Sequence, residues 1–406
     1  MQKPTSIQGF KKFKLIIILA LMSSIAPLST DMYLPALTHV EQSFKTSTFL
    51  TQLSLASFFI AFSLGQLIYG PLSDIFGRKK PVIFGILLFM ISSFACVMVD
   101  NIFLFIFSRF LQALGGCAGI VIARAIVNDL FEIKEATGIF ALMMVFSSLA
   151  PMISPTFGGI LLNYFSWHSI FITLFILGII LFFMIIFGLQ ESANLTQNQK
   201  FSFRQTLSAY SIVLKDKIFL TYVLSASLAL SAMFAYITGS SFIFTKFFDL
   251  SEQKFAILFG LNAFGFVLCA NINAKLVLKF NSEKILSYAL FLMLVATLIL
   301  FLSAFLNPNF YLFEILIFIS IACLGFIAPN TTTLAMARFK QCSGTASAIL
   351  GTMQFGLAGI VSFFVGIINA NTPIVLAFLM CICVFLANIV YFVTKLKNYS
   401  VTKILN

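Results

Sequence analysis

The chain has 406 residues, of which 60% are hydrophobic and only 9% are charged, and its mean hydropathy is +1.06. This composition excludes an ordinary soluble domain and predicts an integral membrane protein. The net charge of +12 does not indicate a nucleic-acid partner, because most of the 25 Lys and Arg residues fall in short segments on one predicted side of the membrane.

Twelve apolar stretches are long enough to cross a bilayer. About 20 apolar residues span ~30 Å of hydrocarbon as a helix, and the lack of period-two alternation excludes the strands of a membrane barrel. The predicted spans are 15–36, 47–70, 81–99, 102–127, 136–162, 168–190, 218–240, 254–275, 285–306, 309–333, 343–369 and 372–394. Placing both termini in the cytoplasm puts the basic loops inside, as expected for a cytoplasmic membrane protein. The Lys-rich start shows no convincing cleavage site, so we expect an uncleaved first helix.

The longest polar interruption divides the chain into two halves. It predicts a six-helix bundle over 1–190, a cytoplasmic linker over 191–217 and a second six-helix bundle over 218–406. The segment Phe76–Lys80 after the second span has a weak counterpart in Phe280–Lys284 after the eighth. This echo favours an internal duplication, which is how many secondary transporters are built. The predicted fold class is therefore all-α, with twelve transmembrane helices in two bundles.

Two ionisable residues lie inside predicted spans. Asp31 is about five residues from the outer end of the first span and Arg109 about seven residues from the outer end of the fourth, which places them ~8 and ~10 Å deep. A charge pair or a hydrogen-bonded network between them is therefore feasible. Because a charge at bilayer depth costs at least ~2.5–3.5 kcal/mol, both residues are candidates for function.

The loop between the second and third spans reads GPLSDIFGRKK over residues 70–80. Glycine at its start permits close packing or a sharp exit, the aspartate can pair with a base or a helix N-terminus, and the second glycine supplies a turn. One interpretation is a basic loop that only sets topology. The other is a cytoplasmic latch that favours one conformation of a two-state carrier. The candidate latch residues are Gly70, Asp74, Gly77, Arg78 and Lys79.

The fifth predicted span combines prolines with glycines, at Pro151, Pro155, Gly158 and Gly159. Prolines bend a transmembrane helix, and small residues let a neighbouring backbone approach closely. We expect a kinked packing helix that can also act as a hinge.

These segments resemble motifs of the major facilitator superfamily. The loop 70–80 is similar to its signature GxLxDxxGRK, and the segment from Arg109 to Gly115 is similar to the RxxQG element of its drug/proton antiporters. Further segments resemble the Bcr/CflA branch, the group of bicyclomycin-resistance and chloramphenicol-efflux proteins: 31–36, 124–129, 167–171, 234–240, 329–330 and 344–348. The resemblance spans nearly the whole chain and implies a twelve-helix drug/proton antiporter.

The implied function is proton-driven export of small organic compounds across a bacterial cytoplasmic membrane. Asp31 would take a proton from outside and release it inside, and Arg109 nearby would favour the carboxylate form. Candidate polar contacts to the substrate are Tyr33, Tyr236, Asn330 and Gln354. Export of an endogenous metabolite or siderophore, and uptake by symport, remain alternatives.

Other classes of protein fit less well. A passive channel needs an open polar path, and a membrane-embedded enzyme needs clustered catalytic side chains, whereas the chain has only two histidines. Without a GxxxxGK[ST] loop, ATP is not the direct energy source. The seven cysteines lack metal-ligand spacing. We expect no metal or cofactor and a monomer that engages substrate, protons and lipid. Glu314, near the start of the tenth span, is either an interfacial acid or part of a second site.

Overall fold

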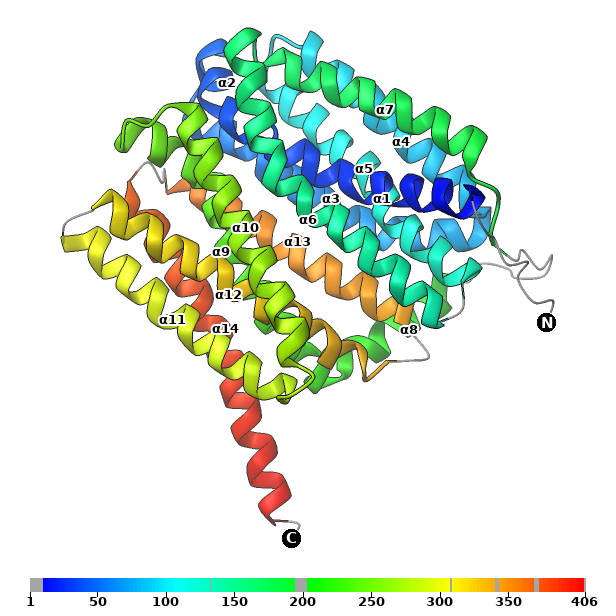
Figure 1. The fold of residues 1–406 in the computed structure, drawn as a ribbon, viewed down its shortest axis with the longest axis vertical. Coiled ribbons are helices and arrows are strands. Elements are labelled where there is room, and N and C mark those ends of the chain that lie inside the picture. Colours follow the sequence, from blue (N-terminus) through cyan, green and yellow to red (C-terminus); the bar gives the residue numbers. More distant parts are fainter. Residues whose placement is uncertain are drawn as a thin grey trace. The chain divides into compact units, whose positions relative to one another are not determined.

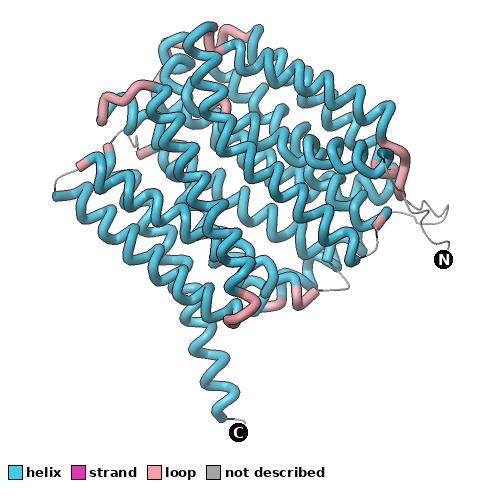
Figure 2. Tube along the Cα trace, viewed as in Figure 1, coloured by secondary structure: helices cyan, strands magenta, loops and turns pink. Residues whose placement is uncertain are grey.

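The computed structural model describes residues 10–131, 133–193, 203–306, 309–339, 343–368 and 372–404. Throughout these residues the chain forms helices joined by short loops, and they contain no strand (Figure 2). The contacts divide the chain into two compact units, Met1–Phe203 and Arg204–Asn406, which are called unit 1 and unit 2 below (Figure 1). The all-α membrane fold expected from the sequence is confirmed.

The described residues of unit 1 form seven α-helices and one 3-10 turn. Their bounds are α1 Phe10–Asp31, η1 Leu34–Ala36, α2 Leu37–Ser43, α3 Thr48–Phe76, α4 Lys79–Met98, α5 Ile102–Leu130, α6 Ile133–Tyr164 and α7 His168–Gly188. The described part of unit 2 also forms seven α-helices, with one π-helical turn. Their bounds are α8 Phe203–Lys215, α9 Lys217–Phe242, η2 Ile243–Phe247, α10 Glu252–Leu276, α11 Ser282–Leu306, α12 Phe310–Met336, α13 Ser343–Ile367 and α14 Pro373–Ile404.

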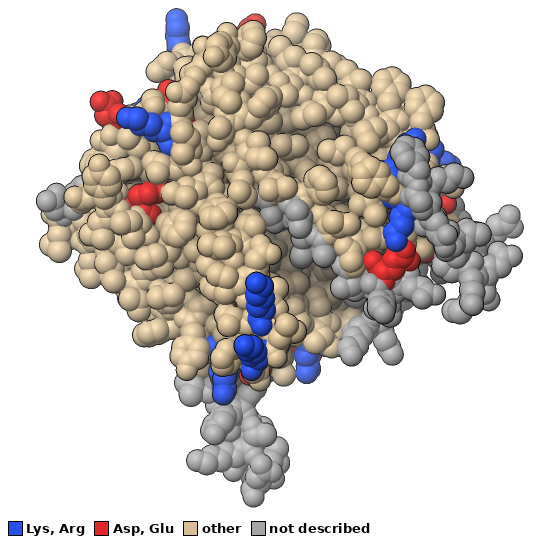
Figure 3. Space-filling view, in the orientation of Figure 1, with Lys and Arg blue, Asp and Glu red and all other residues tan. Residues whose placement is uncertain are grey.

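Eleven helical segments of the described chain are long and apolar enough to cross a membrane. Their outer faces carry large apolar side chains, such as Phe187 and Leu306, which are 77% and 79% exposed. Most of the surface in view carries no charge (Figure 3). The remaining predicted span, 136–162, falls on α6, where several side chains lie outside the described part. The count of twelve and the cytoplasmic termini therefore stay predictions.

Polar caps fix where several spans begin. The side chains of Ser47, Asn101, Asp216 and Asn309 each accept a hydrogen bond from a backbone N–H in the first turn of α3, α5, α9 and α12. The first N–H groups of a helix have no partner within the helix, so these caps stabilise each start. The caps thus mark sequence positions at which an apolar run becomes a helix.

Two features differ from the sequence prediction. The first span does not end at residue 36, because the chain turns at η1 and resumes a helix at Leu37, so the candidate span extends to Ser43. The predicted linker 191–217 contains the helix α8. Val213 of α8 is fully buried in an apolar cluster with Phe219 and Val223 of α9, which holds α8 against α9.

The two units repeat one packing pattern. In unit 1 the first span, α1, packs on α5, α6 and α7, while α5 also packs on α3 and α4. In unit 2 the first span, α9, packs on α12, α13 and α14, while α12 also packs on α10 and α11. Each long helix of unit 1 thus has a counterpart in unit 2, which is what a duplicated six-span bundle would produce.

Candidate functional site

Asp31 is the last residue of α1 and lies at a break inside the first candidate span. Pro27 lies inside α1 and Pro35 inside η1, and each removes a backbone donor from the helix. The Asp31 side chain is only 5% exposed, and its Oδ1 accepts a hydrogen bond of 3.1 Å from the Thr30 hydroxyl. Because the span continues to Ser43, Asp31 lies further from its end than the predicted boundary suggested.

Two glycines, one on α5 and one on α6, let these helices pack directly against the backbone of the first span. A Cβ on Gly158 of α6 would overlap the Met32 carbonyl oxygen and would lie 3.0 Å from its carbonyl carbon. In α5, a Cβ on Gly119 would likewise lie 3.1 Å from the carbonyl carbon of Met22. The predicted hinge glycine Gly158 is therefore a contact point for the helix break beside Asp31. Its neighbour Gly159 is also buried.

The helix that carries Gly158 does not break at its prolines. Pro151 and Pro155 both lie inside α6, which stays helical from Ile133 to Tyr164. The Ser154 hydroxyl donates to the Ala150 carbonyl, one turn back. Such a bond supplies a donor to the backbone and often accompanies a bend in a helix. A hinge role for these prolines stays a prediction.

Arg109 is completely buried and stacks among aromatic rings. Its guanidinium carbon lies 4.5 Å from the ring centroid of Phe58, 4.8 Å from that of Tyr33 and 5.6 Å from that of Phe171. Such stacking stabilises a buried cation by ~2 kcal/mol or more per favourable contact. Its Nε and Nη2 have no hydrogen-bond partner in the described chain.

The remaining nitrogen of Arg109, Nη1, links α5 to α1. It donates to the Ser29 carbonyl at 3.2 Å and to the Gln112 side chain at 2.5 Å. Gln112 in turn donates to the Ser93 hydroxyl of α4 at 2.7 Å. The last carbonyls of a helix lack partners and carry partial negative charge, so a cation is stabilised there. Arg109 thus caps the end of the helix on which Asp31 lies.

The structure does not bring the side chains of Asp31 and Arg109 into an ion pair. Ion pairs of unit 1 such as Arg78–Asp129 and Lys12–Glu135 involve other residues. The sequence argument placed both at similar depth but could not show which acceptor the guanidinium would face. In this structure the acceptor is the Ser29 carbonyl, two residues before Asp31. Any communication between the two residues therefore runs through the end of α1.

Three of the four candidate substrate contacts are buried and bonded within their own unit. The Tyr33 hydroxyl shares a 2.9 Å hydrogen bond with Ser54, and Asn330 donates to Asn273 at 2.7 Å. The Tyr236 hydroxyl accepts from Asn262 at 3.0 Å. Of these four candidates, only Gln354 of α13 is partly exposed in this conformation.

Glu314 is a second buried acid, in unit 2, and not an exposed headgroup contact. Its side chain is 8% exposed, and Oε1 accepts a 2.9 Å hydrogen bond from Asn262. Asn262 itself is 1% exposed and belongs to α10. The sequence pointed to the acid but not to Asn262, because a single amide within an apolar span carries no distinctive pattern.

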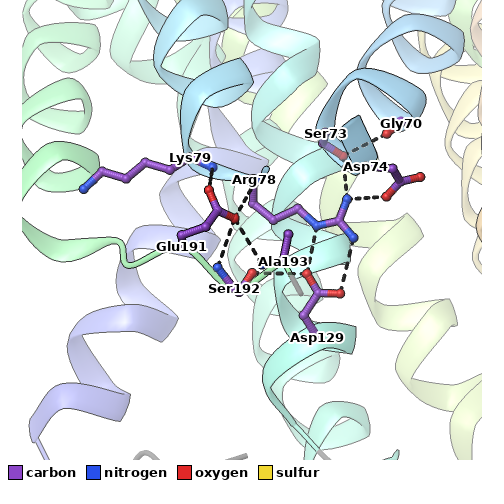
Figure 4. A network of polar contacts seen from close by, with 9 residues as sticks. All are labelled: Gly70, Ser73, Asp74, Arg78, Lys79, Asp129, Glu191, Ser192 and Ala193. Atoms are coloured by element: carbon purple, nitrogen blue, oxygen red, sulfur yellow. Dashed lines mark hydrogen bonds and ion pairs between the residues drawn. The ribbon is translucent and has the colours of Figure 1, made fainter. Parts of the chain in front are cut away.

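The predicted latch residues form a network at one end of unit 1 (Figure 4). Arg78 donates to Asp129 of α5 at 2.8 and 3.3 Å and to Asp74 of α3 at 2.5 Å. Lys79 donates from Nζ to the Ile186 carbonyl of α7 at 2.8 Å. Partial burial lowers the pKa of Arg78, but its hydrogen bonds to Asp129 and Asp74 outweigh burial and raise it. The loop therefore ties three helices together through one guanidinium.

Glu191, the first residue of the predicted linker, completes this network. Its carboxylate accepts hydrogen bonds from the backbone N–H of Arg78 at 2.7 Å and of Lys79 at 3.1 Å, at the start of α4 (Figure 4). Partial burial raises the pKa of Glu191, but these and two further backbone hydrogen bonds outweigh burial and lower it. Ser192 extends the link by donating to Asp129 at 3.1 Å.

The two glycines of the loop are not equivalent. Gly77 has φ +84°, and a Cβ there would lie 2.7 Å from the Glu191 carboxyl carbon, so both backbone and space require glycine. A Cβ on Gly70 would meet nothing within 4 Å. Close packing is therefore not the reason for glycine at position 70. Among the described residues, no group of three or more His, Cys, Asp and Glu side chains could hold a metal ion.

Comparisons with known proteins agree with this architecture. The sequence profile described as the Major Facilitator Superfamily matches residues 19–363. The chain is 33% identical to the MFS-type transporter YdgK of Bacillus subtilis (strain 168), over 95% of this chain and 96% of the relative. It is 26% identical to a bicyclomycin resistance protein homolog of Haemophilus influenzae, over 95% and 97%. The solved D-xylose-proton symporter is similar in fold, with TM-score 0.75 and 14% identity over 94% and 97% of the chains. The chain belongs to the major facilitator superfamily, as a multi-pass transporter of the cytoplasmic membrane.

Proposed function

We propose that this transporter is a proton-coupled antiporter that exports small organic compounds by alternating access. The observation that carries the proposal is Asp31, a buried carboxyl without an ion-pair partner in the described chain, at a helix break within a span. Intramembrane acids are rare and usually mark proton or substrate pathways. Relatives named as a bicyclomycin resistance protein homolog and as multidrug transporters support organic compounds as the substrate class.

The position of Asp31 explains how a proton could bias the conformation. A negative charge at the end of α1 meets the partial negative charge of the last carbonyls, so ionisation of Asp31 disfavours this arrangement. Protonation from outside removes that repulsion, and release of the proton inside restores it. Arg109 opposes the repulsion because it donates to the Ser29 carbonyl of the same helix end. The charge of Asp31 therefore acts on the packing of α1 against α5 and α6.

The network around Arg78 would act on the same equilibrium from the cytoplasmic side. It joins α3, α4, α5 and the segment after α7 through charged hydrogen bonds. Such bonds are short and stronger than neutral ones, and they are lost if these ends separate. The loop can thus favour one conformation without touching substrate. Gln354 is the candidate contact exposed in the present conformation, and Tyr33, Tyr236 and Asn330 would contact substrate only after a rearrangement.

The proposal is tested by measuring export in cells that lack their own efflux pumps. Cells producing the transporter are challenged with a panel of antimicrobial compounds, with and without a protonophore. Antiport predicts that some compounds accumulate less in producing cells and that the protonophore abolishes the difference. Everted vesicles with an imposed pH gradient then give the direction of transport. Flux that persists unchanged without a proton gradient would contradict the proposal, and flux in the same direction as protons would indicate symport.

A further inference from the structure

Unit 2 contains a buried polar cluster that the account of Asp31 does not use. It consists of Tyr236 on α9, Asn262 on α10 and Glu314 on α12, which are 1%, 1% and 8% exposed. The amide nitrogen of Asn262 donates to the Tyr236 hydroxyl at 3.0 Å and to Glu314 Oε1 at 2.9 Å. Three helices thus place their polar groups at one buried point.

Two acceptors of this cluster have no donor. Glu314 Oε2 and Asn262 Oδ1 are both fully buried and form no hydrogen bond in the described chain. No described Lys, Arg or His of any helix packed on α12 pairs with Glu314, and the titratable group that faces it is the Tyr236 hydroxyl. The surroundings are apolar, since the Tyr236 ring stacks on Phe259 at 5.5 Å. Unsatisfied buried acceptors are costly, so the cluster lacks a hydrogen-bond donor.

A single proton on Glu314 removes the buried negative charge, and it supplies a donor for the Asn262 oxygen if the amide turns over. With the carboxylate charged, the amide NH₂ donates to Glu314 and to the Tyr236 oxygen, as in the present geometry. With the carboxyl protonated and the amide rotated by half a turn, the amide oxygen accepts both the carboxyl O–H and the tyrosine O–H. The oxygen and nitrogen of an amide occupy nearly equivalent positions, so this exchange needs no backbone movement.

We propose that Glu314 is a second proton-binding site, with Asn262 as the amide whose orientation follows the proton. The proton binds to the Glu314 carboxylate and leaves as the same proton, so no other reactant is needed. A metal ion fits less well, because the cluster offers one carboxylate and one amide oxygen in an apolar setting. The use of this site in the transport cycle rests on the proposed antiport, whereas proton binding itself does not.

The test is infrared difference spectroscopy of the purified full-length transporter between acidic and alkaline pH, without substrate. We expect the wild type to show a protonated-carboxyl C=O band that is missing in Glu314→Gln. Glu283→Gln is the control, because Glu283 is another hydrogen-bonded acid of the same unit: its Oε1 accepts a 2.9 Å hydrogen bond from the Tyr222 hydroxyl. That variant should keep the band.

A second variant covers the case in which Glu314→Gln does not fold. Asn262→Leu removes the amide but keeps the acid, and it should shift the frequency of the same band. A spectrum of Glu314→Gln identical to that of the wild type, or of Asn262→Leu if the first variant is unfolded, would overturn the proposal. Loss of the band on adding NaCl at constant pH would overturn it in favour of a sodium site. Because no substrate is present, failure here is separate from failure of proton-coupled export.

Discussion

The fourth span of each unit carries one buried charge near its start, and the two charges have opposite sign. In unit 1, Arg109 of α5 lies against Tyr33 of the first span, whose hydroxyl bonds Ser54 of the second span. In unit 2, Glu314 of α12 is joined to Tyr236 of the first span through Asn262 of the second. The first, second and fourth spans of each unit thus hold a tyrosine, a small polar side chain and a charge, respectively.

The two charged groups differ in whether they can exchange a proton. A guanidinium stays protonated in proteins, so Arg109 can only stabilise or orient its neighbours. It does this by stacking on aromatic rings and by capping α1. A carboxylate can take up and release a proton, and Glu314 has an amide beside it instead of rings. In unit 1 the proton-exchanging group that we propose is instead Asp31, on the helix that Arg109 caps. The fourth span therefore carries a fixed charge in unit 1 and a titratable group in unit 2.

The largest effect should come from disturbing the helix break beside Asp31 in unit 1. Glu314 of unit 2, in contrast, lies inside a continuous helix. Gly158→Ala places a Cβ against the Met32 carbonyl. Overpacking of this kind costs ~1–3 kcal/mol, so we expect transport to fall by about tenfold or more. Gly138→Ala in the same helix is the control, since nothing lies within 4 Å of its Cβ. Equal transport by both variants would show that the close contact at Met32 is unimportant.

Substitution of Arg109 tests the fixed charge. Arg109→Ala loses the ring contacts, but removing a buried charge saves at least ~2.5–3.5 kcal/mol. We therefore expect the protein to remain folded while transport falls, by less than in Gly158→Ala. Arg109→Lys should retain part of the transport, because an ammonium can reach a carbonyl but cannot stack as a flat group. Transport rate and thermal unfolding midpoint are measured for both, and full activity of the Lys variant would contradict the stacking argument.

Removing the hydroxyl of Tyr33 or of Tyr236 compares the two units through a smaller change. Tyr33→Phe and Tyr236→Phe each lose one neutral hydrogen bond, worth ~0.5–1.5 kcal/mol, so their unfolding midpoints should drop by similar small amounts. Only Tyr236→Phe should alter the titration of the Glu314 carboxyl band, since Asn262 then has one acceptor fewer. An equal change of that band in Tyr33→Phe would remove the distinction between the units.

The smallest effect should come from the Glu191 cap of the network at Arg78. Because the folded-state pKa of Glu191 is lowered, its contribution to stability is present above the unfolded value of roughly 4.3 and is lost as pH falls through the folded value. The unfolding midpoints of wild type and Glu191→Gln should differ at neutral pH and converge in acid. Asp100→Asn, an exposed acid of the same unit, serves as the control. A difference that grows in acid would contradict the sign of this pKa shift.

Much of the fold could be predicted because a run of about 20 apolar residues is recognisable in the sequence as a membrane span. Asp31 and Arg109 could be singled out for the same reason, since each interrupts an apolar run. The break after Asp31 could not be located, because the apolar pattern continues through Pro27 and Pro35 without saying where the helix ends. The structure therefore ends the first span at Ser43, whereas the sequence analysis ended it at residue 36.

The hydrogen-bond partners of the site residues were harder to predict than the positions of these residues within the spans. The acceptor of Arg109 is a backbone carbonyl, which every residue possesses, so the sequence carries no signal for Ser29. Asn262 and Glu191 were missed for related reasons. The first is one amide among many polar residues, and the second begins a segment that reads as a linker. Their roles follow only from which helix ends and faces the fold brings together.

The most direct test of proton coupling at Asp31 is proton flux in proteoliposomes that contain the purified transporter. A substrate found by the export panel is added, and the internal pH is followed with an indicator dye. The account predicts substrate-driven proton movement in the wild type and in Asp249→Asn, an exposed acid of a loop. It predicts none in Asp31→Asn, although this variant should still insert and bind substrate. Substrate-driven proton movement at the wild-type rate in Asp31→Asn would show that another group carries the proton.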